Sequence, residues 1–220
     1  MNKLDRKPLV VFGAGVISEA VVCELESQGY VVEYLCVDEQ YLVSSRPPLL
    51  EVFDLSEISK IAPPLTHDSF VAVGYQDLNA FRAEKVAQMQ ALGYRLISSG
   101  LDQGGAPNSM ISAKALVQTG SSIGRNSFVW DGAIVGHHSV IGNDCWIASG
   151  ATIGGNCSVG SGSFIGLGAI ISHEVKIGQK SIIGAGAVVS RDVEPGGVIF
   201  PPASHQHRMK ASNFIRLFPL

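Results

Sequence analysis

The chain repeats a six-residue pattern without interruption over more than a third of its 220 residues. From Ile111 to Glu194 it divides into fourteen hexads, and each begins with Ile or Val. Gly is second in eight of them, and the fifth residue is Ala, Ser or Cys in twelve, with Val175 and Val193 as the exceptions. Neither the period of a helix nor that of a strand returns one residue class to every sixth place. A fixed six-residue period indicates a β-helix.

Each hexad is expected to form one short strand and one turn, and three hexads to close a triangular coil. The Ile or Val of the first position then points inward and stacks on its equivalents eighteen residues away. The small fifth residue fills the narrower part of the interior, and Gly at the second position permits backbone angles that a Cβ would make costly. Coils pair at about 4.8 Å. Fourteen hexads make between four and five coils, whose ends need caps.

Residues 8–99 alternate strand and helix patterns. Strands are predicted at Pro8–Phe12, Val31–Val37, Phe70–Val73 and Tyr94–Ile97, and helices at Val16–Gln28 and Phe81–Leu92. Asn79 is a candidate N-cap for the second helix. This alternation predicts a small parallel sheet with helices on both faces. Gly100–Met110 has three Gly and one Pro and reads as a linker into the first coil.

The turn Gly13-Ala14-Gly15 after the first strand partly matches a dinucleotide fingerprint, but Ser18 stands where a third Gly belongs. It is either a tight strand-to-helix turn or a phosphate site on a helix N-terminus. Asp38, at the end of the second strand, could accept hydrogen bonds from a ribose or a base.

Composition excludes several classes of protein. The net charge of −3 gives no general attraction for nucleic acid. The sequence contains no uninterrupted apolar run of 18 residues, so no membrane span is predicted. The N-terminus lacks a signal-peptide pattern. The four cysteines show no metal spacing, and Cys145 and Cys157 fall on interior fifth positions. A cytoplasmic protein with reduced thiols is the simplest interpretation.

The hexads resemble the left-handed parallel β-helix of the hexapeptide acyltransferases. A truncated Rossmann-like α/β domain before such a β-helix is similar to the sugar acyltransferases that N-acetylate nucleotide-linked amino sugars. Others in the group O-acetylate sialic acid. The segment VGYQDLNAFR (Val73–Arg82) is similar to a Gly-Tyr…Asn…Arg stretch of their first domain. The implied division is an α/β domain over 1–99 that binds the nucleotide sugar, a linker over 100–110, a β-helix over 111–200 and a tail over 201–220.

By this resemblance the first domain holds the nucleotide of the sugar's carrier, with five candidate contacts: Gly13, Ala14, Gly15, Asp38 and Tyr75. The acyl donor is expected to be acetyl-CoA, lying in a groove between adjacent β-helices of a homotrimer. Its candidate contacts are Trp146, Gly155, Leu167 and Ala185. Trp146 replaces a His that some members direct at the thioester carbonyl, and an indole N–H donates but cannot accept. The alternative for Trp146 is an aromatic packed at the subunit interface.

Transfer of an acyl group to an amine needs a base near neutral pKa, for which imidazole is suited. The resembled family uses a His at the third hexad position, often followed by an acid. His137 occupies that position and is the predicted base. His138 follows it in place of the acid, as a second candidate. Glu174 or Asp131 could orient the imidazole across a subunit boundary. His173 lies two coils from His137, on the order of 10 Å away at strand spacing, and is expected outside direct reach.

The expected function is therefore acetyl transfer from acetyl-CoA, without a metal, to a nucleotide-linked amino sugar, with a 4-amino-4,6-dideoxy sugar as the expected acceptor. The product would enter surface-glycan or lipopolysaccharide biosynthesis. O-acetylation of sialic acid or another sugar is the alternative. A zinc carbonic anhydrase of the same fold would need a third His at position 178, which is Gly. A scaffold without catalysis is the third class. Beyond Glu194, His205, His207, Arg208 and Lys210 form a basic tail, and 214–218 are apolar.

Overall fold

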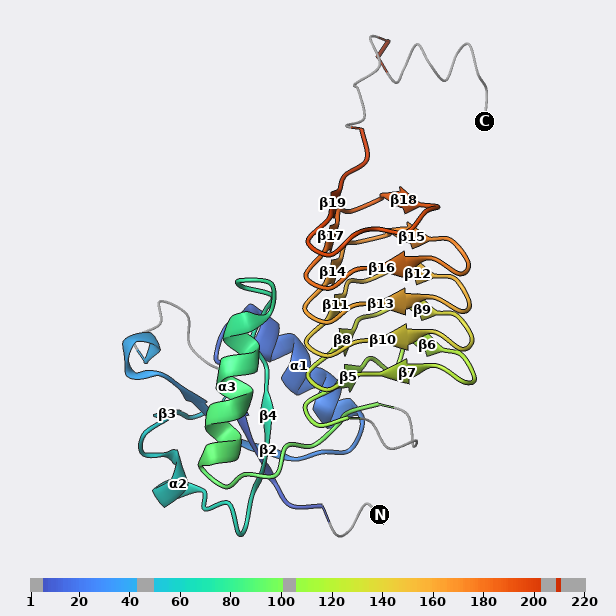
Figure 1. The fold of residues 1–220 in the computed structure, drawn as a ribbon. Coiled ribbons are helices and arrows are strands. Elements are labelled where there is room, and N and C mark those ends of the chain that lie inside the picture. Colours follow the sequence, from blue (N-terminus) through green and yellow to red (C-terminus); the bar gives the residue numbers. More distant parts are fainter. Residues whose placement is uncertain (1–5, 43–49, 101–105, 203–208, 211–220) are drawn as a thin grey trace.

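The computed structural model describes residues 6–42, 50–100, 106–202 and 209–210 and contains a small α/β domain and a triangular β-helix (Figure 1). The predicted basic and apolar tail lies almost entirely outside the described residues. The α/β domain has a parallel sheet in the order β3-β2-β1-β4. Its elements are β1 (Leu9–Phe12), α1 (Val16–Ser27), β2 (Val32–Val37), the 3-10 helix η2 (Glu39–Tyr41), β3 (Val52–Asp54), α2 (Ile58–Ile61), β4 (Asp68–Val71) and α3 (Ala80–Ala91).

Helices cover both faces of this sheet, as predicted. One face packs against α1 through Val21, Val22 and Leu25. The other packs against α2 and α3 through Ile58, Val86 and Met89. The side chains of β1 alternate between these two clusters, which is the period-two pattern of a strand buried on both sides.

Three details of the α/β domain differ from the prediction. β3 and α2 were not anticipated, because each is too short to show a period. The predicted strand Tyr94–Ile97 is reduced to a single bridge between Leu96 and Ser69. Asn79 does precede α3, but its side chain makes no capping hydrogen bond, and its φ of 68° lies in the left-handed region.

The β-helix has three faces of stacked parallel strands. The docked face, which carries the α/β domain, consists of β5 (Met110–Ile111), β8 (Phe128–Val129), β11 (Trp146–Ile147), β14 (Phe164–Ile165), β17 (Ile182–Ile183) and β19 (Val198–Ile199). The aliphatic face consists of β6 (Leu116–Val117), β9 (Ile134–Val135), β12 (Thr152–Ile153), β15 (Ile170–Ile171) and β18 (Val188–Val189). The third face consists of β7 (Ser122–Ile123), β10 (Val140–Ile141), β13 (Ser158–Val159) and β16 (Lys176–Ile177).

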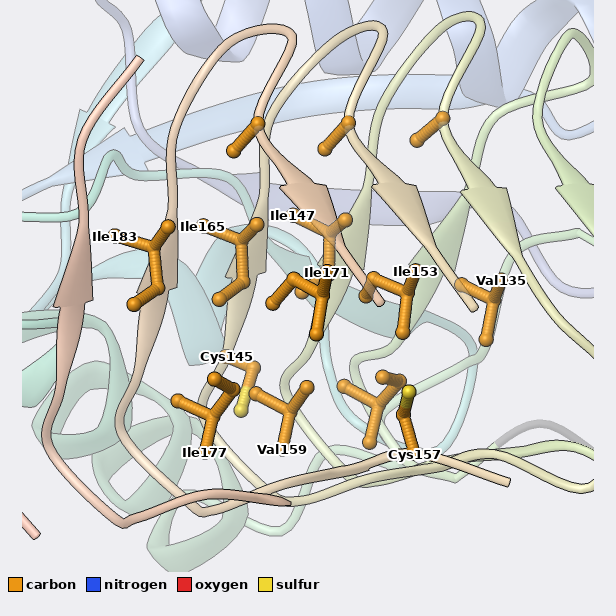
Figure 2. Packing of buried hydrophobic residues seen from close by; sticks show 14 of the residues in the cluster. Val135, Cys145, Ile147, Ile153, Cys157, Val159, Ile165, Ile171, Ile177 and Ile183 are labelled. Carbon is orange, nitrogen blue, oxygen red and sulfur yellow. The ribbon is translucent and has the colours of Figure 1, made fainter. Parts of the chain in front are cut away.

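Each strand consists of the sixth residue of one hexad and the first residue of the next. The first residue points inward, so Ile147, Ile165 and Ile183 form one column of the interior (Figure 2). Cys145 and Cys157 fill interior positions, as predicted, and burial raises the pKa of the Cys145 thiol to about 11. The sixth residue points outward, where its identity is free to differ from face to face.

The predicted eighteen-residue register holds through most of the stack. Trp146 pairs with Phe164, for example, and Ile153 with Ile171. The last coil departs from it, because Ile182 pairs with Val198, sixteen residues away. The chain shortens this coil by two residues where the hexads end, just before Pro195.

The two domains share one hydrophobic core. Leu9, Val11 and Phe70 of the sheet belong to the same buried cluster as Phe128 and Trp146 of the docked face. At the end of the β-helix where the first coil begins, α1 caps this coil through polar contacts. Glu24 Oε1 accepts from Ala113 N at 2.6 Å, and Gln28 Nε2 donates to Ile111 O at 3.3 Å. The α/β domain therefore supplies both a lateral support and an end cap.

Candidate active site

A cleft of about 780 Å³ opens at the carboxyl edge of the α/β sheet. The ends of β1, β2 and β4 form its floor, and its lining includes Gly13, Ala14, Gly15 and Tyr75, four of the five predicted nucleotide contacts. This edge is where open α/β sheets bind ligands. The start of α1 adds backbone N–H groups at the positive end of a helix, which suit an anion.

The turn after β1 requires glycine at position 13 for a steric reason. Gly13 has φ of +125°, and a Cβ there would lie 2.6 Å from the carbonyl oxygen of Ala72. Ser18, which stands in place of a third glycine, is buried and donates from Oγ to the carbonyl of Gly15 at 2.7 Å. The side chain at position 18 thus stabilises the turn from the helix side.

Asp38 lies at the end of β2, as predicted, but its carboxylate already has a cationic partner. Lys85 of α3 is buried and places Nζ 2.9 Å from Oδ1 and 2.8 Å from Oδ2. The ammonium also lies over the rings of Phe12 and Phe81, which line the cleft. Any ligand contact with Asp38 would therefore share the carboxylate with Lys85.

Trp146 does not lie at an open groove in this chain. It is only 5% exposed and packs in an aromatic cluster on the docked face, with ring centroids 5.2 Å from Tyr75 and 5.7 Å from Phe128. Tyr75 also contacts Phe164 at 4.8 Å. Trp146 is thus packed between two domains of one chain, and neither the predicted acyl-CoA contact nor the alternative of packing at a subunit interface describes this position.

Arg82, the last residue of the Val73–Arg82 stretch that resembles the family, joins the cleft to the β-helix, although no role was predicted for it from the sequence. It is fully buried, and its guanidinium donates to the carbonyl of Gly74 in the cleft wall, to Asn126 and to the carbonyl of Cys145. Its Cζ lies 4.3 Å from the centroid of the Phe128 ring. Burial lowers the Arg82 pKa to about 9. A charge at this depth needs all of these partners.

The predicted base lies on an edge of the prism remote from the docked face. The turns between the aliphatic face and the third face form this histidine edge, which consists of residues 119–120, 137–138, 155–156, 173–174 and 191–192. His137 and His138 are both exposed, and their Nδ1 atoms are 3.2 Å apart. One ring must donate this hydrogen bond to the other, because two lone pairs cannot bond. His138 is therefore the group that orients His137 within the chain.

Two glycines make room for these rings. A Cβ on Gly155 would lie 2.5 Å from His137 Nε2, and a Cβ on Gly120 would lie 2.7 Å from His138 Cδ2. The His137 ring thus lies against the next coil along the chain, at Gly155, and the His138 ring lies against the preceding coil, at Gly120. Gly155 was predicted as an acyl-CoA contact. In the structure, the predicted base His137 occupies the space that a side chain at position 155 would take.

His173 is much closer to His137 than we expected. The two ring centroids are 5.9 Å apart, although two coils separate their backbones. Both side chains turn along the edge toward the glycine between them, and backbone spacing alone overestimates such a distance. Glu174 Oε1 lies 3.4 Å from His173 Nε2. Within the chain, Glu174 therefore contacts His173, and its predicted role across a subunit boundary stays a prediction.

The other predicted acyl-CoA contacts lie on a different edge. Leu167 and Ala185 are exposed on the turns between the docked face and the aliphatic face, here called the Leu167 edge (residues 131–132, 149–150, 167–168 and 185–186). Asp131 lies on this edge as well and pairs with Lys114 at 3.4 Å. Within one chain the cleft and the Leu167 edge adjoin the docked face, whereas His137 lies on the opposite edge.

Within the described ranges, no three His, Cys, Asp or Glu side chains are grouped so that they could hold a metal ion. Nor does any helix in the described part of the chain have the length and apolar character needed to cross a membrane.

Comparison with known families and structures agrees with this architecture. Residues 138–173 match the family model described as bacterial transferase hexapeptide (six repeats). A search of curated proteins found no significant match. Among solved structures, the acetyltransferase domain of PglB from Neisseria gonorrhoeae FA1090, in complex with acetyl coenzyme A, superposes with a TM-score of 0.75. It is 27% identical over 87% of this chain and 94% of that one.

Two further structures share the fold at lower identity. A mutant of perosamine N-acetyltransferase from Caulobacter crescentus, in complex with CoA and GDP-perosamine, has a TM-score of 0.76 and 23% identity over 87% of this chain and 92% of that one. WeeI from Acinetobacter baumannii AYE has a TM-score of 0.75 and 22% identity over 87% and 95%. The predicted fold class, a small parallel α/β domain followed by a left-handed β-helix, is confirmed.

Proposed function

We propose that this chain, which matches the bacterial transferase hexapeptide model over residues 138–173, transfers an acetyl or related acyl group from acyl-CoA to the amine of a nucleotide-linked amino sugar. One observation carries the proposal. The same chain has a cleft at the carboxyl edge of a parallel sheet and a pair of contacting imidazoles on an edge of the β-helix.

His137 is the proposed general base. When His137 Nδ1 donates to His138 Nδ1, the lone pair of His137 is on Nε2, the nitrogen that lies over Gly155. Nε2 then takes the proton that the amine loses as it attacks the thioester carbon. A positioned base of this kind contributes about 10²–10⁴-fold in rate.

The proposed active site is completed by a second protomer. The aliphatic face carries exposed apolar side chains at outward positions, with Leu116 52%, Ile170 46% and Val188 66% exposed. Such a stripe favours burial against copies of itself. If this face of each protomer turns toward a threefold axis, the two edges that bound it meet their neighbours. The histidine edge of one protomer then lies beside the Leu167 edge of the next.

This arrangement removes a difficulty of the single chain, where the cleft and His137 are on opposite sides of the prism. In the trimer, the cleft of one protomer serves the His137 of its neighbour, and acyl-CoA lies between the two edges. Gly155 of one chain and Leu167 and Ala185 of the other are the proposed acyl-CoA contacts. Asp131 is brought toward the partner's histidine edge. Trp146 is left out of this set because the α/β domain covers it.

The cleft is proposed to hold the nucleotide, with the N–H groups of the Gly13–Gly15 turn at the phosphates. Residues 1–99 would then form the substrate-binding domain, 100–110 a linker and 111–200 the acyltransferase domain, in a cytoplasmic enzyme of surface-glycan or lipopolysaccharide synthesis. The acetyl-CoA bound by the PglB domain supports the choice of acyl donor. A 4-amino-4,6-dideoxy sugar is the proposed acceptor, and O-acetylation of sialic acid is the alternative.

The test is release of free thiol from acetyl-CoA in the presence of a panel of nucleotide-linked amino sugars, with free sialic acid as the competing acceptor. Thiol release that requires a nucleotide-linked amino sugar is the expected result. His137→Ala should lower kcat by about 10²–10⁴-fold with an unchanged melting temperature, because its side chain is exposed. Gln179→Ala, at the same hexad position of another edge, is the matched control.

Full turnover by His137→Ala would refute the base. Thiol release with sialic acid alone would replace N-acetylation by O-acetylation. No thiol release with any acceptor, together with no binding of acetyl-CoA, would refute an acyltransferase.

A further inference from the structure

Acyl transfer needs two kinds of group in the active site, and only the first of them, the base, has been assigned to a residue. A base must take the amine proton, and hydrogen-bond donors must stabilise the negative charge that develops on the thioester oxygen. The base and the donor must each lie about 3 Å from the reacting atoms. Since the amine nitrogen and the oxyanion are bonded to the same carbon, both groups must be within reach of a single acetyl group.

Trp146 cannot supply the second kind of group in this chain. Its side chain is buried among the aromatic rings of the docked face, whereas His137 lies on the opposite edge of the prism. Side chains that share the edge with His137 are therefore the nearest candidates within the chain.

His173 is the side chain that has this position. Its ring centroid is 5.9 Å from that of His137, and the planes are inclined by 52°. Gly155 lies in the coil between the two residues, and His137 Nε2 lies over it. The nitrogen that acts as the base therefore points toward the coil that carries His173, and the missing Cβ at position 155 leaves the two rings with no side chain between them.

Among the described residues, the polar contacts of His173 are made by Nε2, which leaves Nδ1 for a ligand. Asn156 Nδ2 lies 3.5 Å from His173 Nε2, and Glu174 Oε1 lies 3.4 Å from the same nitrogen. When the Asn156 amide donates to Nε2, the hydrogen of the neutral ring is on Nδ1. When the ring is doubly protonated, Nε2–H faces the Glu174 carboxylate and Nδ1 again carries a hydrogen. In these two states Nδ1–H has no partner among the described residues and can donate, and the role considered below requires one of them, because a neutral ring that donates Nε2–H to Glu174 has only a lone pair on Nδ1.

We propose that His173 is a second catalytic residue of the histidine edge, which donates a hydrogen bond from Nδ1 to the thioester oxygen while His137 acts as the base. This inference rests on the proposed acyl transfer. The amine nitrogen attacks the thioester carbon, the C=O electron pair moves onto oxygen, and the amine proton passes to His137 Nε2. The intermediate then re-forms the C=O bond, the C–S bond breaks, and the departing CoA thiolate takes the proton from His137.

The test separates this role from turnover by observing the thioester itself. Acetyl-CoA labelled with ¹³C at the carbonyl is bound to the full-length protein, and the isotope-edited infrared band of the bound carbonyl is recorded. A hydrogen bond to the oxygen lowers the stretching frequency. His173→Ala should therefore move the band to higher wavenumber, and His173→Gln, which keeps an N–H donor, should restore part of the shift. Gln179→Ala should leave the band at its wild-type position.

Kinetics with the acceptor that the thiol-release assay identifies provide the second readout. Loss of one oxyanion donor lowers kcat by about 10²–10³-fold, and since the bond strengthens only as charge develops, KM should stay close to the wild-type value. His173→Gln should regain part of kcat. A role limited to folding would not produce this split between kcat and KM.

A carbonyl band that stays in place in His173→Ala would overturn the inference and leave the proposed function intact. Absence of any bound carbonyl band in the wild-type protein would overturn both. A raised KM with unchanged kcat would also overturn it, because His173 would then contribute only to binding.

Discussion

The docked face and the histidine edge come from the same repeat and serve opposite purposes. On the docked face, the outward residues Phe128 and Trp146 are buried under a second domain. On the histidine edge, His137 and His138 are exposed, and neighbouring coils carry glycine to make room for them. The repeat fixes the backbone of both regions through its inward residues. Outward positions are therefore free to become an interface in one place and a site in another.

If this comparison is correct, the same hexad position should differ greatly in its contribution to stability from face to face. Phe128→Ala empties a fully buried position and should cost about 3–5 kcal/mol of unfolding free energy. Val140→Ala, at the sixth position on the third face where Val140 is 52% exposed, should change it by less than about 0.5 kcal/mol. Urea denaturation of both variants measures the difference, and similar losses would break the comparison.

On the histidine edge, the expected effect is on activity. Gly155→Ala places a methyl group where His137 Nε2 lies, so the exposed ring must rotate away. A displacement of about 1 Å from the productive geometry can cost about 10²-fold in rate, whereas the melting temperature should change little. The kcat of Gly155→Ala in the wild-type and His137→Ala backgrounds measures the coupling. A loss that is equally large without the imidazole would contradict this account.

The smallest expected effect concerns the join between the two regions. Arg82→Lys keeps the charge but cannot reproduce the donor set that reaches Gly74, Asn126 and Cys145. The loss should be about 1–3 kcal/mol of unfolding free energy. Arg125→Lys, whose side chain is 51% exposed, is the control and should be nearly neutral. Equal results for the two variants would show that the buried network contributes nothing.

How far the sequence predicts the structure also differs between the regions. The β-helix follows from Ile and Val at every sixth place, because that period is local and fits one winding of the backbone. The contacts of Trp146 with Tyr75 and of Arg82 with Cys145 join residues more than sixty positions apart, and no period in the sequence encodes them. The short β3 and α2 give too few residues for a pattern.

The distance between His137 and His173 shows a different limit. Strand spacing gives the separation of their backbones, but the side chains approach each other along the edge. The sequence contains one signal of this approach, namely Gly155 midway between the two histidines in the same column of turns. That glycine suggested room for a ligand, and in the structure the His137 imidazole uses the space that its Cβ would take.

Because the α/β domain packs on the first coils, the two ends of the β-helix differ in how firmly they are anchored. Its first coils are anchored by Glu24, Gln28 and the aromatic cluster, whereas Val198 of the last strand, β19, and Phe200 just after it are more than half exposed in the described part of the chain. A stack in which each layer supports only its neighbours frays from its weaker end. Thermal opening should therefore begin at the β19 end and travel toward the end anchored by α1, so that the coils with His137 outlast the coil that shortens before Pro195.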